Sequence, residues 1–146
     1  MDPNRVYLVQ TDTTVGFVSQ DMARLNAIKG RSENQPCLIC VPTCKVLLTK
    51  VRVPNPFKNQ VRRAKKTTFL YPNTNAVRIV HDPHHKQFLE NFGWMYSTSA
   101  NPTKKIFDME YAKENADEII EDERGFFEAP ASAFWQLGLK NRRKLR

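Results

Sequence analysis

Apolar residues occur along the chain in short blocks, and the spacing within each block distinguishes strands from helices. Between two such blocks, Met22, Leu25 and Ile28 recur at helical spacing, which predicts an amphipathic helix. Asp21 precedes this helix, where a carboxylate is favourable at the positive end of the helix dipole. Continuous apolar blocks with the length of buried strands occupy residues 6–9, 37–41 and 94–96.

Turn and cap residues delimit the other predicted elements. Residues 67–71 and 75–80 flank a short turn that contains proline, which predicts a hairpin. Asp82 and Pro83 suit the N-cap and first position of a helix, so a helix is expected to begin there. Because strands and helices interleave irregularly, we expect a single domain over the chain (1–146), with an α+β or mixed α/β sheet covered by helices. Further helices are predicted at residues 43–51, 57–64 and 108–115, and closing strands at residues 118–120 and 133–137.

The charge of the chain points to an anionic partner. The formal net charge is +8, which suits either nucleic acid or nucleotide phosphate. Lys and Arg concentrate at residues 58–66 and 142–146, and each run is either a solvated face or a contact surface. No apolar run approaches the roughly 20 residues of a membrane span, and the N-terminus lacks the apolar segment of a signal peptide. We therefore expect a cytoplasmic protein that does not span a membrane.

Three cysteines and three histidines suggest a metal site that their spacing does not favour. Residues three apart on a strand face opposite sides, and no fourth ligand has a suitable spacing from the cysteines. The cysteines are therefore expected to be buried structural thiols, and the histidines to be exposed at a helix start. The residues concerned are Cys37, Cys40 and Cys44, and His81, His84 and His85.

Polar motifs with candidate chemistry follow the predicted strands and the first helix. Residues 11–14 (TDTT) come directly after an apolar run, and residues 97–102 (STSANP) follow another. Lys29 and Arg31 flank Gly30 at the helix exit, where two cations can point at one anion. A simpler interpretation is that these three residues only terminate the helix, with a glycine cap and favourable charges.

In their order along the chain, these motifs resemble those of the YrdC-like (TsaC-type) family, the threonylcarbamoyl-AMP synthases of tRNA modification. The resemblance implies a twisted open mixed sheet with flanking helices, curled around a basic concave pocket. The family motif P-T-[DE]-T-V-Y-G-L corresponds to residues 10–17, K-x-R to 29–31, V-R-[IV]-P to 77–80, S-x-N to 99–101, and P-S…L-R to 130–132 and 144–146.

The resemblance also implies a reaction and a set of site residues. Family members condense L-threonine, bicarbonate and ATP to threonylcarbamoyl-AMP and pyrophosphate, with Mg²⁺ held mainly by the ATP phosphates and no metal ligands from the protein. Further partners would be tRNA and the proteins that transfer the threonylcarbamoyl group to it. No nucleophile stands beside a base in this sequence, so catalysis would rest on positioning and charge neutralisation. The implied residues are Lys29 and Arg31 for catalysis, Lys29, Arg31, Ser99, Asn101 and Arg146 for the nucleotide, and Thr11, Thr13 and Arg78 for threonine.

Departures from the family motifs leave two alternatives open. Val15 replaces a tyrosine, Gln10 and Ser32 replace prolines, and residues 64–66 replace a rigid proline-glycine turn with two charges. One alternative is a degenerate relative that binds nucleotide but not threonine. The other is an RNA-binding module without catalysis, which steep salt dependence without an ATP requirement would reveal.

Overall fold

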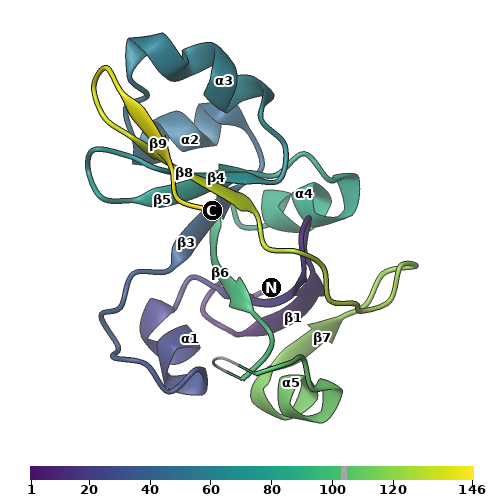
Figure 1. Cartoon of the computed structure of the whole chain (residues 1–146). Helices are drawn as coiled ribbons and strands as arrows, with labels where there is room; N and C mark the ends of the chain where they lie inside the picture. Colours follow the sequence, from purple (N-terminus) through teal and green to yellow (C-terminus); the bar gives the residue numbers. More distant parts are fainter. Residues whose placement is uncertain (103–104) are drawn as a thin grey trace.

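The computed structural model describes residues 1–102 and 105–146, and its nine strands in these ranges form one mixed sheet (Figure 1). The strands are β1 (Tyr7–Gln10), β2 (Val15–Ser19), β3 (Leu38–Val41), β4 (Thr67–Leu70), β5 (Ala76–Ile79), β6 (Met95–Ser99), β7 (Glu118–Ile120), β8 (Ala133–Leu137) and β9 (Arg142–Lys144). The helices are α1 (Met22–Ile28), α2 (Cys44–Lys50), α3 (Lys58–Arg63), α4 (Pro83–Glu90) and α5 (Met109–Asn115), with a 3₁₀ turn η1 (Asn55–Phe57) before α3.

The sheet has the strand order β7-β1-β2-β6-β3-β5-β4-β8-β9 and consists of two halves. The β1 half comprises β7, β1, β2 and β6 with helices α1 and α5, and the β5 half comprises β3, β5, β4, β8 and β9 with α2, η1 and α3. β6 joins the halves, because it pairs antiparallel with both β2 and β3. The mixed α/β class that the sequence predicts is therefore confirmed.

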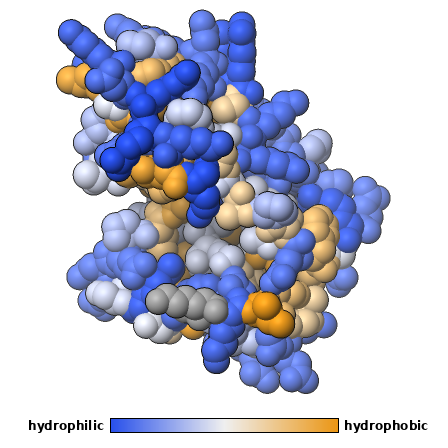
Figure 2. Space-filling model, in the orientation of Figure 1, coloured by the Kyte–Doolittle hydropathy of each residue, from blue (hydrophilic) through white to orange (hydrophobic). Residues whose placement is uncertain are grey.

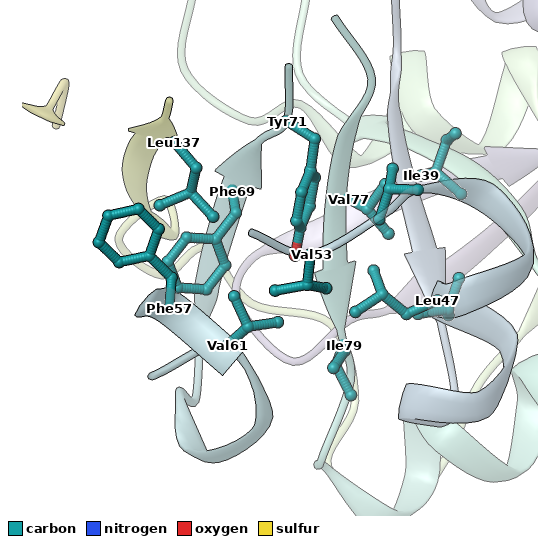
Figure 3. Packing of buried hydrophobic residues seen from close by; sticks show 12 residues of the cluster. Ile39, Leu47, Val53, Phe57, Val61, Phe69, Tyr71, Val77, Ile79 and Leu137 are labelled. Atoms are coloured by element: carbon teal, nitrogen blue, oxygen red, sulfur yellow. The ribbon is translucent and has the colours of Figure 1, made fainter. Parts of the chain in front are cut away.

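Each half has its own apolar core, and a third cluster lies where they meet. In the β5 half, Leu47 of α2 and Val61 of α3 pack on Phe69 and Val77 of the sheet (Figure 3). In the β1 half, Leu25 of α1 packs against the strands. The third cluster combines residues of both halves with helix α4: Tyr7, Val9, Val18, Cys40, Val80, Phe88, Leu89 and Met95.

The predicted helix starts are confirmed by their side-chain caps. The Asp21 side chain accepts a hydrogen bond from the backbone N–H of Arg24, and the Asp82 side chain accepts one from that of His85. Thr43 caps α2 in the same way, through the N–H of Val46. These caps satisfy backbone donors that a helix start leaves unpaired.

Two strands, β2 and β9, were missing from the sequence prediction. Every residue of β2 is buried, so its sequence does not alternate between apolar and polar residues. Gly16 and Ser19 also shorten the run of apolar residues, so the sequence shows neither pattern that is typical of a strand. In β9 every residue is an exposed cation, and only pairing with β8 makes it a strand. Among the described residues, no helix is long and apolar enough to cross a membrane.

We predict that two neighbouring leucines of α2 differ sharply in their effect on stability. Leu47 is fully buried in the β5-half core, whereas Leu48 is 58% exposed. Leu47→Ala should lower the free energy of unfolding by about 2–5 kcal/mol because it leaves a cavity, and Leu48→Ala should change it by less than about 0.5 kcal/mol. Urea denaturation measures both, and equal effects would contradict the packing of α2 on the sheet.

Candidate functional site

A cavity of about 560 Å³ opens between the two halves of the molecule. Figure 2 shows the molecule hollowed between these halves. None of the described residues that line the cavity is acidic. The lining consists of Thr11, Thr13, Thr14, Gly16, Arg31, Pro36, Cys37, Leu38, Thr68, Leu70, Thr74, Ala76, Arg78, Ser97, Thr98, Ser99, Ala131, Ser132, Phe134 and Arg146.

Three arginines from distant parts of the chain line this cavity. Arg31 follows helix α1, Arg78 lies on β5, and Arg146 ends the chain. Arg146 is held by the residues before β8, since its Nε donates to the Ser132 carbonyl at 2.9 Å. The Nε–H groups of Arg31 and Arg78 are buried, and neither finds an acceptor in the described part of the chain. Such donors suit anionic oxygens.

Hydroxyl groups supply the other polar part of the lining. Thr11 forms a local network, because its Oγ1 accepts from the backbone N–H of Thr13 at 3.1 Å and donates to the Thr14 carbonyl. Across the cavity, the Thr68 and Ser132 hydroxyls hydrogen-bond to each other at 2.8 Å. These groups can donate to or accept from a ligand, so they suit sugar and phosphate oxygens as well as anions.

Gly16 lets two strands approach closely beside these hydroxyls. It pairs with Ser99 across β2 and β6, and a Cβ there would lie 2.9 Å from the Thr98 carbonyl oxygen. A backbone atom cannot move aside as a flexible side chain can, so only glycine fits. The glycine therefore helps to place Ser99 against the cavity.

The structure brings the Lys29–Arg31 motif and the Ser99–Asn101 loop together. Lys29 Nζ donates to the Ser99 carbonyl at 2.9 Å and to the Asn101 carbonyl. Gly30, at φ +67°, turns the chain after the helix, as the simpler interpretation also expected. Arg31 and Ser99 line the cavity, whereas Lys29 and Asn101 are not among its lining residues. The roles of all four residues as nucleotide ligands stay predictions.

Burial changes the acidity of Lys29. Its exposed fraction is 7%, and burial, together with the nearby charge of Arg31, lowers the pKa of its ammonium group to about 8. Three oxygen acceptors, the Ser99 carbonyl, the Ser99 hydroxyl and the Asn101 carbonyl, surround the ammonium group. The ammonium group of Lys29 therefore holds the loop after β6 against the end of α1.

A buried polar cluster behind the cavity was not predicted from the sequence. Asp12, in the loop after β1, forms an ion pair with Arg78, with Oδ1 and Nη2 3.0 Å apart and both side chains 3% exposed. His85 of α4 accepts a hydrogen bond at Nδ1 from the Asp12 backbone N–H at 3.2 Å. The cluster thus joins the β1 half, the β5 half and α4.

The prediction that the three histidines are exposed is wrong for His85. Its side chain is completely buried, whereas His81 is exposed and the partly buried His84 lies 3.1 Å from Glu123. His85 precedes Phe88 and Leu89 by three and four residues, so all three share the face of α4 that enters the core. This spacing is the signal that could have identified it.

The members of this cluster influence each other's protonation. Burial disfavours the Asp12 carboxylate, but His85 and the Arg78 charge outweigh it and hold the pKa of Asp12 below its ordinary value. Burial lowers the pKa of His85, because a second buried cation beside Arg78 would be costly. We therefore assign Asp12 and Arg78 as an ion pair and His85 as a neutral imidazole.

The prediction that the three cysteines are buried is confirmed for two of them. Cys37 and Cys40 are buried, and burial raises the pKa of the Cys40 thiol to about 11. Cys44 is only partly buried, because it starts α2 beside the core rather than inside it. In the described ranges, no group of three or more His, Cys, Asp or Glu residues could hold a metal ion.

Comparison with known proteins defines the fold. No protein-family model matches the sequence, and neither does any curated protein. Among solved structures, P. abyssi Sua5 complexed with L-threonine is 18% identical with a TM-score of 0.78, and E. coli YciO is 20% identical with a TM-score of 0.78. Full-length HypF in a phosphate- and nucleotide-bound form is 14% identical, with a TM-score of 0.75.

The aligned regions cover nearly the whole chain but different shares of these proteins. They include 97%, 98% and 97% of this chain against Sua5, YciO and HypF, and 50%, 82% and 26% of those chains. The chain therefore spans about half the length of P. abyssi Sua5. The YrdC-like fold that the sequence motifs imply is confirmed.

We predict that the Asp12 carboxylate is needed for stability. Asp12→Asn leaves the Arg78 charge buried without its partner, so the free energy of unfolding at pH 7 should fall by about 3–5 kcal/mol. Glu118→Gln, which removes an exposed pair with Arg5, should cost less than about 1 kcal/mol. Chemical denaturation measures both, and similar losses would contradict the buried pair.

We also predict that His85 makes the protein sensitive to mild acid. In the unfolded chain the imidazole of His85 has a pKa of about 6.5, and in the folded protein burial lowers this pKa. Below about pH 6.5 the unfolded chain therefore binds a proton that the folded protein does not bind at His85. The free energy of unfolding should decrease as the pH decreases, by up to about 1.4 kcal/mol per pH unit. Asp12 stays ionised between pH 5 and 7, since its pKa is lowered.

His85→Gln should flatten this pH dependence between pH 7 and 5, whereas His81→Gln, which changes an exposed histidine, should leave it as in wild type. The measurement is the free energy of unfolding at each pH. An unchanged slope in His85→Gln would show that His85 binds protons equally in the folded and unfolded protein over this pH range, and would contradict its buried neutral state.

Proposed function

We propose that the chain binds ATP and L-threonine in this cavity and, with bicarbonate, forms threonylcarbamoyl-AMP and pyrophosphate. The observation that carries this proposal is the meeting of three arginines and many hydroxyls in a cavity without acidic lining residues among those described. Two proteins that share the fold support it, one solved with L-threonine and the other in a phosphate- and nucleotide-bound form.

The nucleotide would lie against Arg31, Ser99 and Arg146. A guanidinium fork can grip two phosphate oxygens, and the buried Nε–H of Arg31 is one donor for them. Lys29 would contribute positive charge from behind the loop that contains Ser99 and Asn101. Mg²⁺ would bind mainly through the ATP phosphates and water and help to neutralise their charge.

L-Threonine would lie against Thr11, Thr13 and Arg78. Asp12 already compensates the Arg78 charge when no ligand is present, which explains how an arginine can remain buried at the cavity wall. The Nε–H of Arg78 finds no acceptor in the described structure, so it can donate to the substrate carboxylate. Asp12 would thus orient Arg78 and leave it a donor for substrate.

The chemistry requires positioning and charge stabilisation rather than a protein nucleophile. The threonine amine and bicarbonate condense to a carbamate with release of one water molecule, whose hydrogen atoms come from the amine and from bicarbonate. A carbamate oxygen then attacks the α-phosphorus of ATP. The bond from this phosphorus to the bridging oxygen breaks, and pyrophosphate leaves. Negative charge increases on the phosphoryl oxygens, where Arg31 and Lys29 would stabilise it.

Two departures from the family motifs have structural explanations. Val15 is buried in the core of the β1 half and is not among the residues that line the cavity, so its side chain contributes to packing. Gln10 links two loops, because its Oε1 accepts from the Phe127 backbone N–H at 2.8 Å and its amide donates to the Thr13 carbonyl. Both residues therefore support the cavity from outside.

We predict that pyrophosphate release from ATP in the presence of Mg²⁺ requires L-threonine and bicarbonate together.

We also predict that Arg31→Lys weakens ATP binding. The substitution keeps the charge but loses the planar guanidinium fork, and a loss of about 1.5–3 kcal/mol of binding free energy should weaken ATP binding roughly tenfold to a hundredfold. Arg24→Lys is the matched control, since Arg24 is exposed on α1 and pairs with Asp117. Calorimetry measures ATP binding, and a coupled assay measures pyrophosphate.

The same experiment separates the alternatives. If ATP binds but pyrophosphate release is independent of threonine, the protein is a nucleotide-binding relative without synthase activity. If Arg31→Lys and Arg24→Lys bind ATP equally well, Arg31 is not a phosphate ligand. Absence of ATP binding to the wild-type protein would overturn the proposal for the cavity as a whole.

A further inference from the structure

His85 is the member of the buried polar cluster to which the proposed function gives no role. Its side chain is completely buried, on the face of α4 that carries Phe88 and Leu89 into the core. Nε2 of the ring finds no hydrogen-bond partner in the described part of the chain, so burial of the imidazole costs free energy that an apolar side chain would not cost. We therefore expect a compensating contribution from the other ring nitrogen.

The other ring nitrogen, Nδ1, holds the backbone of the loop after β1. The Asp12 backbone N–H donates to Nδ1 at 3.2 Å, and this bond requires a lone pair on that nitrogen. The ring is therefore the neutral tautomer with its proton on Nε2. Because the peptide plane fixes the direction of the N–H, the bond also fixes the orientation of the loop at this residue.

The residue that the imidazole holds lies between two residues that line the cavity. Thr11 and Thr13 belong to the lining, whereas Asp12 is not among the lining residues and pairs with Arg78. Thr11 and Thr13 are linked locally, since Thr11 Oγ1 accepts from the Thr13 backbone N–H at 3.1 Å. A displacement of the Asp12 backbone would therefore move both hydroxyl groups and the carboxylate that faces Arg78.

Helix α4, which lies between the two halves of the molecule in Figure 1, gives His85 a fixed position. Asp82 caps the helix by accepting from the His85 backbone N–H at 2.9 Å. Arg124 joins this cap to the end of β1, because it donates to the Asp82 carboxylate and to the Gln10 carbonyl, each at 3.1 Å. The start of α4 is thus attached to the chain at Gln10 and again, through His85, at Asp12.

The Asp12 carboxylate transmits this order to Arg78. Its Oδ1 lies 3.0 Å from Arg78 Nη2 and 3.5 Å from His85 Nδ1. Because Nδ1 carries no proton, the imidazole does not compete with Arg78 for the carboxylate. The guanidinium group is thereby oriented, and its buried Nε–H, which has no acceptor in the described structure, remains as a donor at the cavity wall.

We propose that His85 is a positioning residue for the amino-acid substrate. Its neutral imidazole holds the Asp12 backbone, and through it the hydroxyl groups of Thr11 and Thr13 and the guanidinium group of Arg78, in the arrangement that binds the substrate. His85 is not among the lining residues, so it acts through Asp12 and not by contact with substrate. This inference rests on the proposed function, because it takes L-threonine to bind in this part of the cavity.

The test compares two substitutions that differ in the hydrogen-bond acceptor. His85→Leu removes the acceptor and leaves the buried Asp12 N–H without its partner, so L-threonine should bind at least about tenfold more weakly. His85→Asn places an amide oxygen close to the position of Nδ1, and it should restore the affinity to within about threefold of wild type. Calorimetry with L-threonine measures both.

The matched control is His81→Leu, because His81 is exposed. This variant should bind L-threonine as wild type does. ATP binding should stay within about twofold of wild type in all three variants, since the nucleotide would lie against residues outside the cluster. A general loss of structure would weaken the binding of both ligands, and circular dichroism shows whether each variant is folded.

Two measurements without ligand test the contact itself. In wild-type protein at about pH 7.5, ¹⁵N NMR of the imidazole should show a proton on Nε2 and none on Nδ1, and this measurement requires no variant to fold. Amide hydrogen exchange at Asp12 should be at least about tenfold faster in His85→Leu than in wild type, and close to wild type in His85→Asn.

Three results would overturn the proposal. The first is equal affinity of His85→Leu and His81→Leu for L-threonine. The second is a proton on Nδ1 in the wild-type protein. The third is threonine binding by His85→Asn that is as weak as in His85→Leu, although the Asp12 amide stays protected from exchange.

Failure of the proposed function gives a different result. Wild-type protein then binds no L-threonine, although the imidazole tautomer and the exchange at Asp12 are as expected. That outcome overturns the role of His85 in substrate binding together with the proposed function, whereas the three results above overturn the role of His85 alone.

Discussion

The buried ion pair between Asp12 and Arg78 is the interaction on which the arrangement of the cavity depends. Asp12 belongs to the β1 half and Arg78 to the β5 half, so the pair fixes the two walls of the cavity against each other. His85 attaches α4 to the same point. Because a buried charge without its partner is costly, the halves cannot separate here without a large loss of stability. The pair therefore makes a rigid back wall for the cavity.

A second contact, between Lys29 and the loop after β6, governs the other side of the cavity. The Lys29 ammonium group ties the end of α1 to the carbonyls of Ser99 and Asn101. Arg31, two residues later, is thereby placed beside Ser99 on the lining. One short motif thus supplies both a cation that holds a loop, Lys29, and a cation that lines the cavity, Arg31.

Charge is distributed unequally over the molecule. Residues 34–81 and 129–146, which supply the strands and helices of the β5 half, contain 14 of the 23 Lys and Arg residues and no Asp or Glu, and most of the acids lie between positions 108 and 128. The cavity lies at the boundary and takes arginines from both halves. Like charges repel, so such a concentration of cations is tolerated mainly because most of their side chains are exposed and screened by salt.

Helices, caps and the motifs of the site could be predicted from the sequence, because periodicity, N-caps such as Asp21 and Asp82, and the sets around Lys29 and Ser99 are local features. Only the tertiary structure decided β2 and β9, since a strand without a clear apolar pattern exists through its partners in the sheet. The same holds for Asp12 and His85. Whether a carboxylate or an imidazole is buried depends on which distant groups surround it, and here those groups come from segments more than 60 residues apart.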